Sequence, residues 1–166
     1  ANTPTLIRDV AAALGVREAG EQLVARTEKE IADARSAVPN PSGSPRMAFL
    51  YIRGPRLILL SGPQSGADDL IAALGGTDAG TASGLKPGFT QVTTEALLSA
   101  NPDVILVMTQ GADSVGGLDG VLALPGVSQT SAGKAHRVVQ MDETEMLSFG
   151  PDTGKVLGAL ARAIYV

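Results

Sequence analysis

The chain has 166 residues, of which 44% are apolar and 18% are charged, a composition typical of a folded globular protein rather than a disordered tail. Its net charge of −4, with two tyrosines, three phenylalanines and no tryptophan, excludes the basic, aromatic surface expected of a nucleic-acid-binding protein. The lack of cysteine excludes disulfides, iron–sulfur clusters, zinc–thiolate sites and cysteine nucleophiles. The single histidine, His136, excludes a histidine-rich metal site within this chain.

Residues 1–38 are predicted to form a helical arm. Thr3-Pro4 is a helix-start signal, apolar residues then recur at helical spacing, and Gly15 ends this first helix. A longer and more polar helix is expected from Arg17 to Val38. Because its apolar stripe is narrow, this helix is expected to lie along another part of the protein rather than inside a core.

Residues 39–45, rich in proline, serine and glycine, are the predicted linker. From there on, apolar strands alternate with helices, so residues 46–166 are predicted to form a Rossmann-like α/β lobe with a mostly parallel central sheet flanked by helices. The expected strands are 47–52, 57–60, 104–108 and 137–141, the first two as an antiparallel pair, and the expected helices are 65–74, 93–100, 113–122 and 151–165. Residues 77–91 are expected to be irregular.

Ligands of open α/β sheets bind outside the carboxyl ends of the strands, which directs attention to Tyr51 and Arg53. The two residues are two apart on a strand, so their side chains point to the same side. A phenol ionises near pH 10, but a neighbouring guanidinium favours the phenolate, a hard anionic ligand suited to ferric iron. The same spacing also occurs where a strand-end tyrosine packs on the surface beside a solvated arginine, and spacing alone leaves both interpretations open.

The segment Leu60-Ser-Gly-Pro-Gln-Ser-Gly66 is a predicted strand–loop–helix turn. Free backbone N–H groups at a helix start can hold a carboxylate or a phosphate, which makes Ser61 and Ser65 candidate ligand-binding residues. The segment lacks the Gly-x-x-x-x-Gly-Lys-Ser/Thr pattern and is therefore not a nucleotide P-loop. The alternative is a plain turn in which Ser65 caps the following helix.

Two other residues with ionisable side chains, His136 and Glu95, can be explained by their place in the predicted structure alone. His136 precedes a predicted strand and is expected to be a surface loop residue. Glu95 lies in the first turn of a short helix, where a carboxylate suits the helix dipole, and the sharper alternative is an exposed docking charge.

Several segments, taken in order, carry a resemblance to a known family. They are Arg46-Met-Ala-Phe-Leu-Tyr-Ile-Arg-Gly54, Leu60-Ser-Gly-Pro-Gln-Ser65, Ala73-Leu-Gly-Gly76, Val92-Thr-Thr-Glu-Ala-Leu97, Asn101-Pro-Asp-Val-Ile-Leu106 and Leu124-Pro-Gly-Val127. The chain resembles the haem (hemin) substrate-binding proteins of bacterial ABC importers, which belong with the two-lobed cobalamin- and siderophore-binding proteins. The resemblance covers the helix region between the lobes (1–38) and the C-terminal lobe, and the family's N-terminal lobe is absent.

The resemblance implies roles for particular residues. In the family the ligand lies between the lobes, and the positions matching Tyr51 and Arg53 supply the haem-iron ligand and a hydrogen bond to its phenolate. The second axial ligand is a histidine on the N-terminal lobe, which His136 does not match. Glu95 falls at the position of the carboxylate that docks onto arginines of the membrane permease. The turn at Ser61–Ser65 is a hypothetical propionate site.

The resemblance also implies a non-enzymatic protein that delivers haem to an ABC permease for iron uptake, in the periplasm or lipid-anchored at the outer face of the cell membrane. An arm without its partner lobe can exchange between copies, so a dimer is expected. The nearest alternative is a ferric-siderophore or corrinoid lobe of the same class; corrinoids bring their own metal ligands, so a Tyr-x-Arg iron ligand separates the two. A small α/β hydrolase would need a Gly-x-Ser-x-Gly elbow, and the stretch 61–66 lacks its first glycine.

Overall fold

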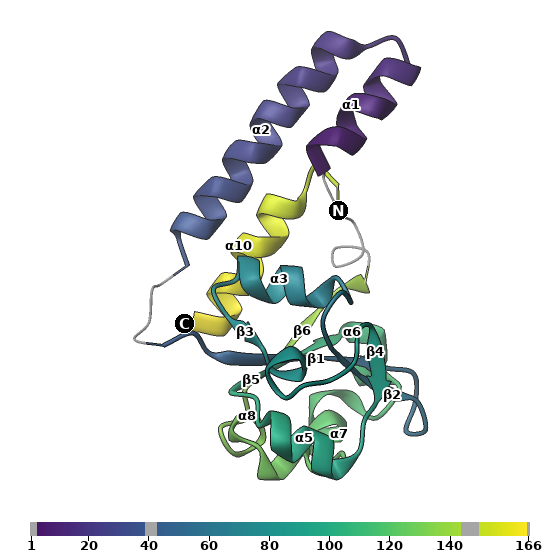
Figure 1. Ribbon diagram of the computed structural model, residues 1–166, viewed down its shortest axis with the longest axis vertical. Helices are drawn as coiled ribbons and strands as arrows, with labels where there is room; N and C mark the ends of the chain where they lie inside the picture. Colours follow the sequence, from purple (N-terminus) through teal and green to yellow (C-terminus); the bar gives the residue numbers. More distant parts are fainter. Residues whose placement is uncertain (1–2, 39–42, 144–149, 166) are drawn as a thin grey trace. The chain divides into compact units, whose positions relative to one another are not determined.

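The computed structural model describes residues 3–38, 43–143 and 150–165. Its contacts divide the chain into two compact units, a helical unit of residues 1–39 and 144–166 and an α/β unit of residues 40–143. Each helix in the described ranges is too short or too polar to cross a lipid bilayer. The helical unit contains α1 (Thr3–Ala13), α2 (Arg17–Ser36) and α10 (Thr153–Tyr165), seen in Figure 1.

The two predicted arm helices form a hairpin, and glycine allows them to approach closely. A Cβ atom on Gly20 of α2 would lie 2.3 Å from the Cβ of Ala11 on α1. Ile7 and Val24 are buried in this unit. Leu6 and Val10, on another side of α1, are apolar but exposed.

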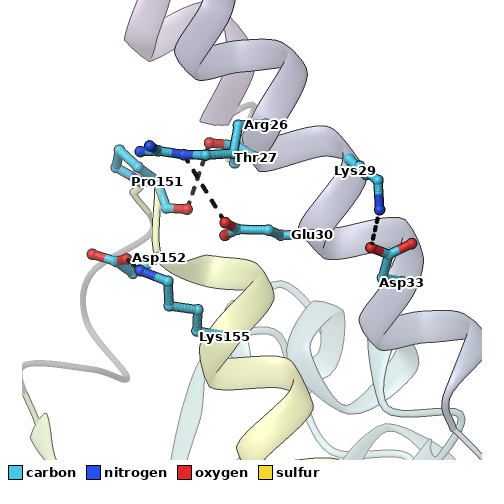
Figure 2. A network of polar contacts seen from close by, with 8 residues as sticks. All are labelled: Arg26, Thr27, Lys29, Glu30, Asp33, Pro151, Asp152 and Lys155. Atoms are coloured by element: carbon cyan, nitrogen blue, oxygen red, sulfur yellow. Dashed lines mark hydrogen bonds and ion pairs between the residues drawn. The ribbon is translucent and has the colours of Figure 1, made fainter.

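Helix α10 packs along α2 (Figure 2). A Cβ on Gly154 would lie 2.6 Å from the carbonyl carbon of Glu30, and the Thr27 hydroxyl donates to the Pro151 carbonyl at 3.5 Å. Three ion pairs are local to one helix or its start: Arg26–Glu30 at 4.0 Å and Lys29–Asp33 at 2.5 Å in α2, and Lys155–Asp152 at 2.6 Å at the start of α10. The last helix was expected to be part of the lobe 46–166. Its contacts group it instead with the arm, because its glycine and apolar face fit against α2.

The α/β unit is built on a six-stranded mixed sheet of order β4-β2-β1-β5-β6, with the short β3 also paired to β1. Three of the five strand pairings are parallel, and β2 is antiparallel to β1 and to β4. The strands are β1 (Arg46–Ile52), β2 (Ile58–Ser61), β3 (Thr77–Asp78), β4 (Phe89–Gln91), β5 (Val104–Met108) and β6 (Val138–Met141). The predicted α/β class and the predicted antiparallel β1–β2 pair are confirmed.

The main core lies on one face of this sheet. Ala48, Leu50 and Ile52 of β1 alternate toward it, and β5 is buried along its whole length, as its continuous apolar run predicted. Figure 1 shows α5, α7 and α8 on this side of the sheet and α3 on the other. The helical segments of the unit are α3 (Ala67–Ala73), α4 (Ala79–Ala82), α5 (Thr94–Ala100), α6 (Thr109–Asp113), α7 (Gly117–Leu122), the 3-10 turn η1 (Val127–Gln129) and α8 (Ser131–Lys134).

Two segments differ from the sequence prediction. Residues 77–91 are not wholly irregular, because they contain β3, α4 and β4, with Asp78 accepting a hydrogen bond from the Thr81 N–H to cap α4. Of the helix expected at 113–122, only residues 117–122 are helical, as α7, and Asp113 is the last residue of the preceding helix α6. Gly116 and Gly117 interrupt the expected helix, both with positive φ (100° and 76°), a conformation that glycine tolerates.

Candidate ligand-binding site

The carboxyl ends of the parallel strands β1, β5 and β6 meet at one edge of the sheet, where two hydrogen bonds join the segments that follow them. The Gly54 N–H, after β1, donates to the Ser114 hydroxyl, after β5, at 2.8 Å. The Gln110 N–H at the start of α6 donates to a carboxylate oxygen of Glu143, after β6, at 2.8 Å. This edge is where an open α/β sheet binds ligands.

Tyr51 and Arg53 form a pair at this edge, as their spacing predicted. The Arg53 Nε–H donates to the Tyr51 hydroxyl oxygen at 3.1 Å, and the guanidinium carbon lies 5.1 Å from the centre of the phenol ring. Tyr51 is partly buried in β1, whereas Arg53 is exposed. The positive charge of Arg53 therefore lies beside the phenol oxygen at the boundary with solvent.

An aromatic surface continues from Tyr51 along the sheet. The Phe89 ring of β4 lies 6.2 Å from the ring of Tyr51 and 6.1 Å from that of Phe49, and its side chain is 42% exposed. Sequence reasoning missed Phe89, because it lies in the stretch expected to be irregular. The apolar aromatic face is well suited to a flat, apolar ligand that also contacts Tyr51.

The turn after β2 does not provide the anion site that was expected. Because β2 is antiparallel to β1, the turn leaves the sheet beside Ser61, which pairs with Phe89, and not at the carboxyl edge of β1. Ser61 is fully buried, and its hydroxyl donates to Asp78 at 3.0 Å. The Ser61 hydroxyl therefore serves the core and is not available to a ligand.

Asp68 occupies the amide groups of the same turn. Its carboxylate accepts from the Gln64 N–H at 2.8 Å and the Gly66 N–H at 2.9 Å. Burial opposes ionisation of Asp68, but these backbone donors outweigh burial and hold the pKa of the carboxyl below its usual value. The Ser65 hydroxyl makes no capping bond and is buried without a hydrogen-bond partner among the described residues, so Asp68, and not Ser65, satisfies the start of α3.

Glu95 and His136 are exposed residues on other elements than the Tyr51–Arg53 pair. Glu95 is exposed in the first turn of α5, whose start is capped by the Thr93 hydroxyl accepting from the Ala96 N–H at 3.1 Å. His136 is exposed just before β6, and therefore at the amino end of that strand, opposite the edge that carries Tyr51.

The described residues limit what the site can hold. In the ranges 3–38, 43–143 and 150–165, no group of three or more histidine, aspartate or glutamate side chains could hold a metal ion. A cavity of about 250 Å³ beside α5 is smaller than typical small-molecule pockets of about 300–1,000 Å³. This cavity is lined by residues such as Leu50, Ile58 and Thr94, and Tyr51 and Arg53 are not among its lining residues.

The α/β unit has the open sheet of a fold class in which ligands bind outside the carboxyl ends of the strands. The family model described as periplasmic binding protein matches residues 2–145, and the chain belongs to this family. The comparison with curated proteins found no match.

Three solved structures are similar to the chain over nearly all of its length. The periplasmic heme-binding protein RhuT from Roseiflexus sp. RS-1 is 40% identical, with a TM-score of 0.92, over 98% of this chain and 61% of RhuT. The periplasmic heme-binding protein BhuT, in complex with two hemes, is 35% identical, with a TM-score of 0.89, over 98% of this chain and 61% of BhuT. The heme-binding protein HmuT is 36% identical, with a TM-score of 0.92, over 99% and 54%. The chain thus spans less than two thirds of these relatives.

Proposed function

We propose that this chain is the haem-binding lobe of a substrate-binding protein that passes haem to an ABC permease for iron uptake. The observation that carries the proposal is the Tyr51–Arg53 pair, with 3.1 Å between Nε and the phenol oxygen, beside the exposed ring of Phe89. RhuT and HmuT are heme-binding proteins, and HmuT has been solved with a tyrosine, an arginine two positions later, or a histidine replaced.

Haem is a flat, apolar disc with ferric iron at its centre and two carboxylates at its edge. Tyr51 supplies an oxygen ligand, and its proton leaves to solvent when the phenolate binds the iron. Arg53 donates to the same oxygen and stabilises its negative charge. The rings of Tyr51 and Phe89 give the porphyrin an aromatic surface to pack against.

The remaining proposed roles rest on the resemblance to the family. Membership in the periplasmic binding protein family places the protein outside the cytoplasm. Glu95, exposed on α5, is the proposed docking carboxylate for cationic residues of the permease. A second lobe would close the other side of the haem and supply the second axial ligand.

A hemin titration followed by visible absorbance tests the proposal. The wild-type chain is compared with Tyr51→Phe, which removes only the hydroxyl, and with Tyr165→Phe, the matched change at the other tyrosine. We expect a saturable ferric spectrum with tyrosinate character in the wild type and in Tyr165→Phe, and its loss in Tyr51→Phe. If all three proteins bind hemin alike, Tyr51 is not the ligand. Saturable binding of a ferric siderophore or of cobalamin in place of hemin would support the alternative ligand class.

A further inference from the structure

We infer that Ser114 is a positioning residue that holds the turn after β1 so that Arg53 lies against Tyr51. The inference rests on the proposed function, because it assigns a further residue to the same haem site. Ser114 follows α6 directly and belongs to the segment between β5 and β6, so its contact with the β1 turn crosses from one strand end to the next.

The Ser114 hydroxyl has a fixed orientation. It donates to the Gly111 carbonyl at 2.6 Å and accepts from the Gly54 N–H at 2.8 Å. A serine hydroxyl has one hydrogen to donate. Because Gly111 takes that hydrogen, a lone pair of the oxygen is left to face Gly54.

The turn that Ser114 holds carries Arg53. The Arg53 N–H donates to the Leu57 carbonyl at 2.9 Å, whereas the return bond from Leu57 N–H to the Gly54 carbonyl is long, at 3.4 Å. Gly54 itself has a φ of 71°. The backbone hydrogen bond of the turn is therefore short at Arg53 and long at Gly54. The bond from the Gly54 N–H to Ser114 adds a second restraint at Gly54.

Helix α6 provides a fixed base for Ser114. A Cβ on Gly111 would lie 3.0 Å from the Ile52 carbonyl oxygen, so α6 lies directly against the end of β1. Its first turn is tied to the buried Glu143 through the Gln110 N–H. Ser114 therefore connects α6, which is held by β1 and by Glu143, to the exposed turn after β1. That turn carries Arg53, whose side chain contacts the Tyr51 phenol.

Because Ser114 is exposed, replacing it should not prevent folding. The test compares Ser114→Ala with Ser114→Thr, which keeps the hydroxyl, and with Ser99→Ala, an exposed serine on α5. Without ligand, we expect hydrogen exchange at the Gly54 amide to accelerate roughly fivefold in Ser114→Ala, the factor of a typical net hydrogen bond. The nuclear Overhauser contact between Arg53 and the Tyr51 ring should weaken with it. Ser114→Thr should restore both signals, and Ser99→Ala should change neither.

The same variants are then titrated with hemin. We expect Ser114→Ala to weaken hemin binding by a few fold and to shift its spectrum toward that of Arg53→Ala, and Ser114→Thr to behave as the wild type. Unchanged Gly54 exchange, an unchanged Arg53–Tyr51 contact or an unchanged hemin spectrum in Ser114→Ala would overturn the inference. If Tyr51→Phe gave the same hemin spectrum as the wild type, the proposed function would be overturned. The Gly54 exchange rate and the Arg53–Tyr51 contact, both measured without ligand, would still decide whether Ser114 positions Arg53.

Discussion

At the residue scale, the proposed function assigns Arg53 the role of stabilising Tyr51 as an iron ligand. Replacing it with alanine removes the hydrogen bond to the Tyr51 oxygen and the adjacent positive charge. Since hydrogen bonds to charged groups contribute about 1.5–3 kcal/mol, we expect hemin affinity to fall by about tenfold or more in Arg53→Ala. The hemin affinity of Arg53→Lys should lie between those of the wild type and Arg53→Ala, because an ammonium keeps the charge but lacks the planar guanidinium. Hemin titration measures the effect.

Arg56 offers a matched control for this prediction. It is exposed on the same turn and carries the same charge, so Arg56→Ala should leave hemin affinity unchanged. An equal loss in Arg53→Ala and Arg56→Ala would mean that general positive charge, and not the contact with Tyr51, assists binding.

Asp68 carries a pH-dependent contribution to stability at the turn before α3. Its folded-state pKa is lowered by the backbone N–H donors of Gln64 and Gly66, against the opposing effect of burial. A lowered folded pKa gives stability that is present above the unfolded pKa and is lost as pH falls through the folded pKa. We expect Asp68→Asn to lower the free energy of unfolding by about 1 kcal/mol at pH 7, and the difference to disappear as the wild-type carboxylate is protonated below about pH 4.

Denaturant unfolding across this pH range measures the Asp68 effect. Asp69→Asn is the control, since Asp69 is the exposed neighbour on the same helix and its replacement removes the same charge while leaving the Asp68 hydrogen bonds in place. A constant difference between wild type and Asp68→Asn from pH 7 to pH 3 would contradict the assigned role of the carboxylate.

At the scale of elements, the contact between α2 and α10 depends on one glycine. A Cβ on Gly154 would lie 2.6 Å from backbone and side-chain carbons of Glu30, whereas a Cβ on Gly158 would meet only the end of Arg162 at 3.7 Å. Overpacking costs typically 1–3 kcal/mol, so Gly154→Ala should lower the free energy of unfolding by about that amount. Gly158→Ala should be neutral or stabilising by up to about 1 kcal/mol, because alanine favours the helix. Thermal unfolding of both variants compares them, and equal stability would show that α10 does not pack on α2 in this way.

Local sequence pattern predicted the elements whose environment is uniform along their length. The buried run of β5 and the two arm helices have such patterns. The three-residue strand β4 was missed, because its pairing with β2 is a long-range contact that leaves no periodicity in so short a segment. The partner of α10 was missed for a similar reason: an amphipathic stripe shows that a helix packs, but not on which element.

The residues of the candidate site also separate into those that local sequence predicted and those that depend on long-range pairing. The two-residue period of a strand placed Tyr51 and Arg53 on one side, and their hydrogen bond agrees with that prediction. Ser61 was assigned to the site because all strand ends were treated alike, although antiparallel pairing turns the end of β2 elsewhere. Ser114 and Phe89 join the neighbourhood of Tyr51 only through the order of strands in the sheet, which a single sequence does not contain.

At the scale of the whole molecule, α1 presents an apolar stripe that the described residues leave uncovered. Leu6 and Val10 of α1 and Leu14, directly after its end, recur every four residues and are 54%, 50% and 70% exposed. Single exposed apolar residues are ordinary, but three in a row along a helix are typical of an interaction surface. The relatives RhuT and HmuT are longer than this chain, which spans 61% and 54% of them.

We expect this 166-residue chain to cover the stripe with a second copy of itself, either face to face or by exchange of the arm. Analytical ultracentrifugation should show a dimer that forms with increasing concentration. The double variant Leu6→Glu, Val10→Glu should stay monomeric, because apposed carboxylates repel and the buried apolar area is lost. Leu98→Glu, at an apolar residue of α5 that is 37% exposed, is the control and should dimerise as the wild type does. A wild-type chain that is monomeric at every concentration, or a Leu98→Glu variant that alone loses the dimer, would show that α1 is not the surface of association.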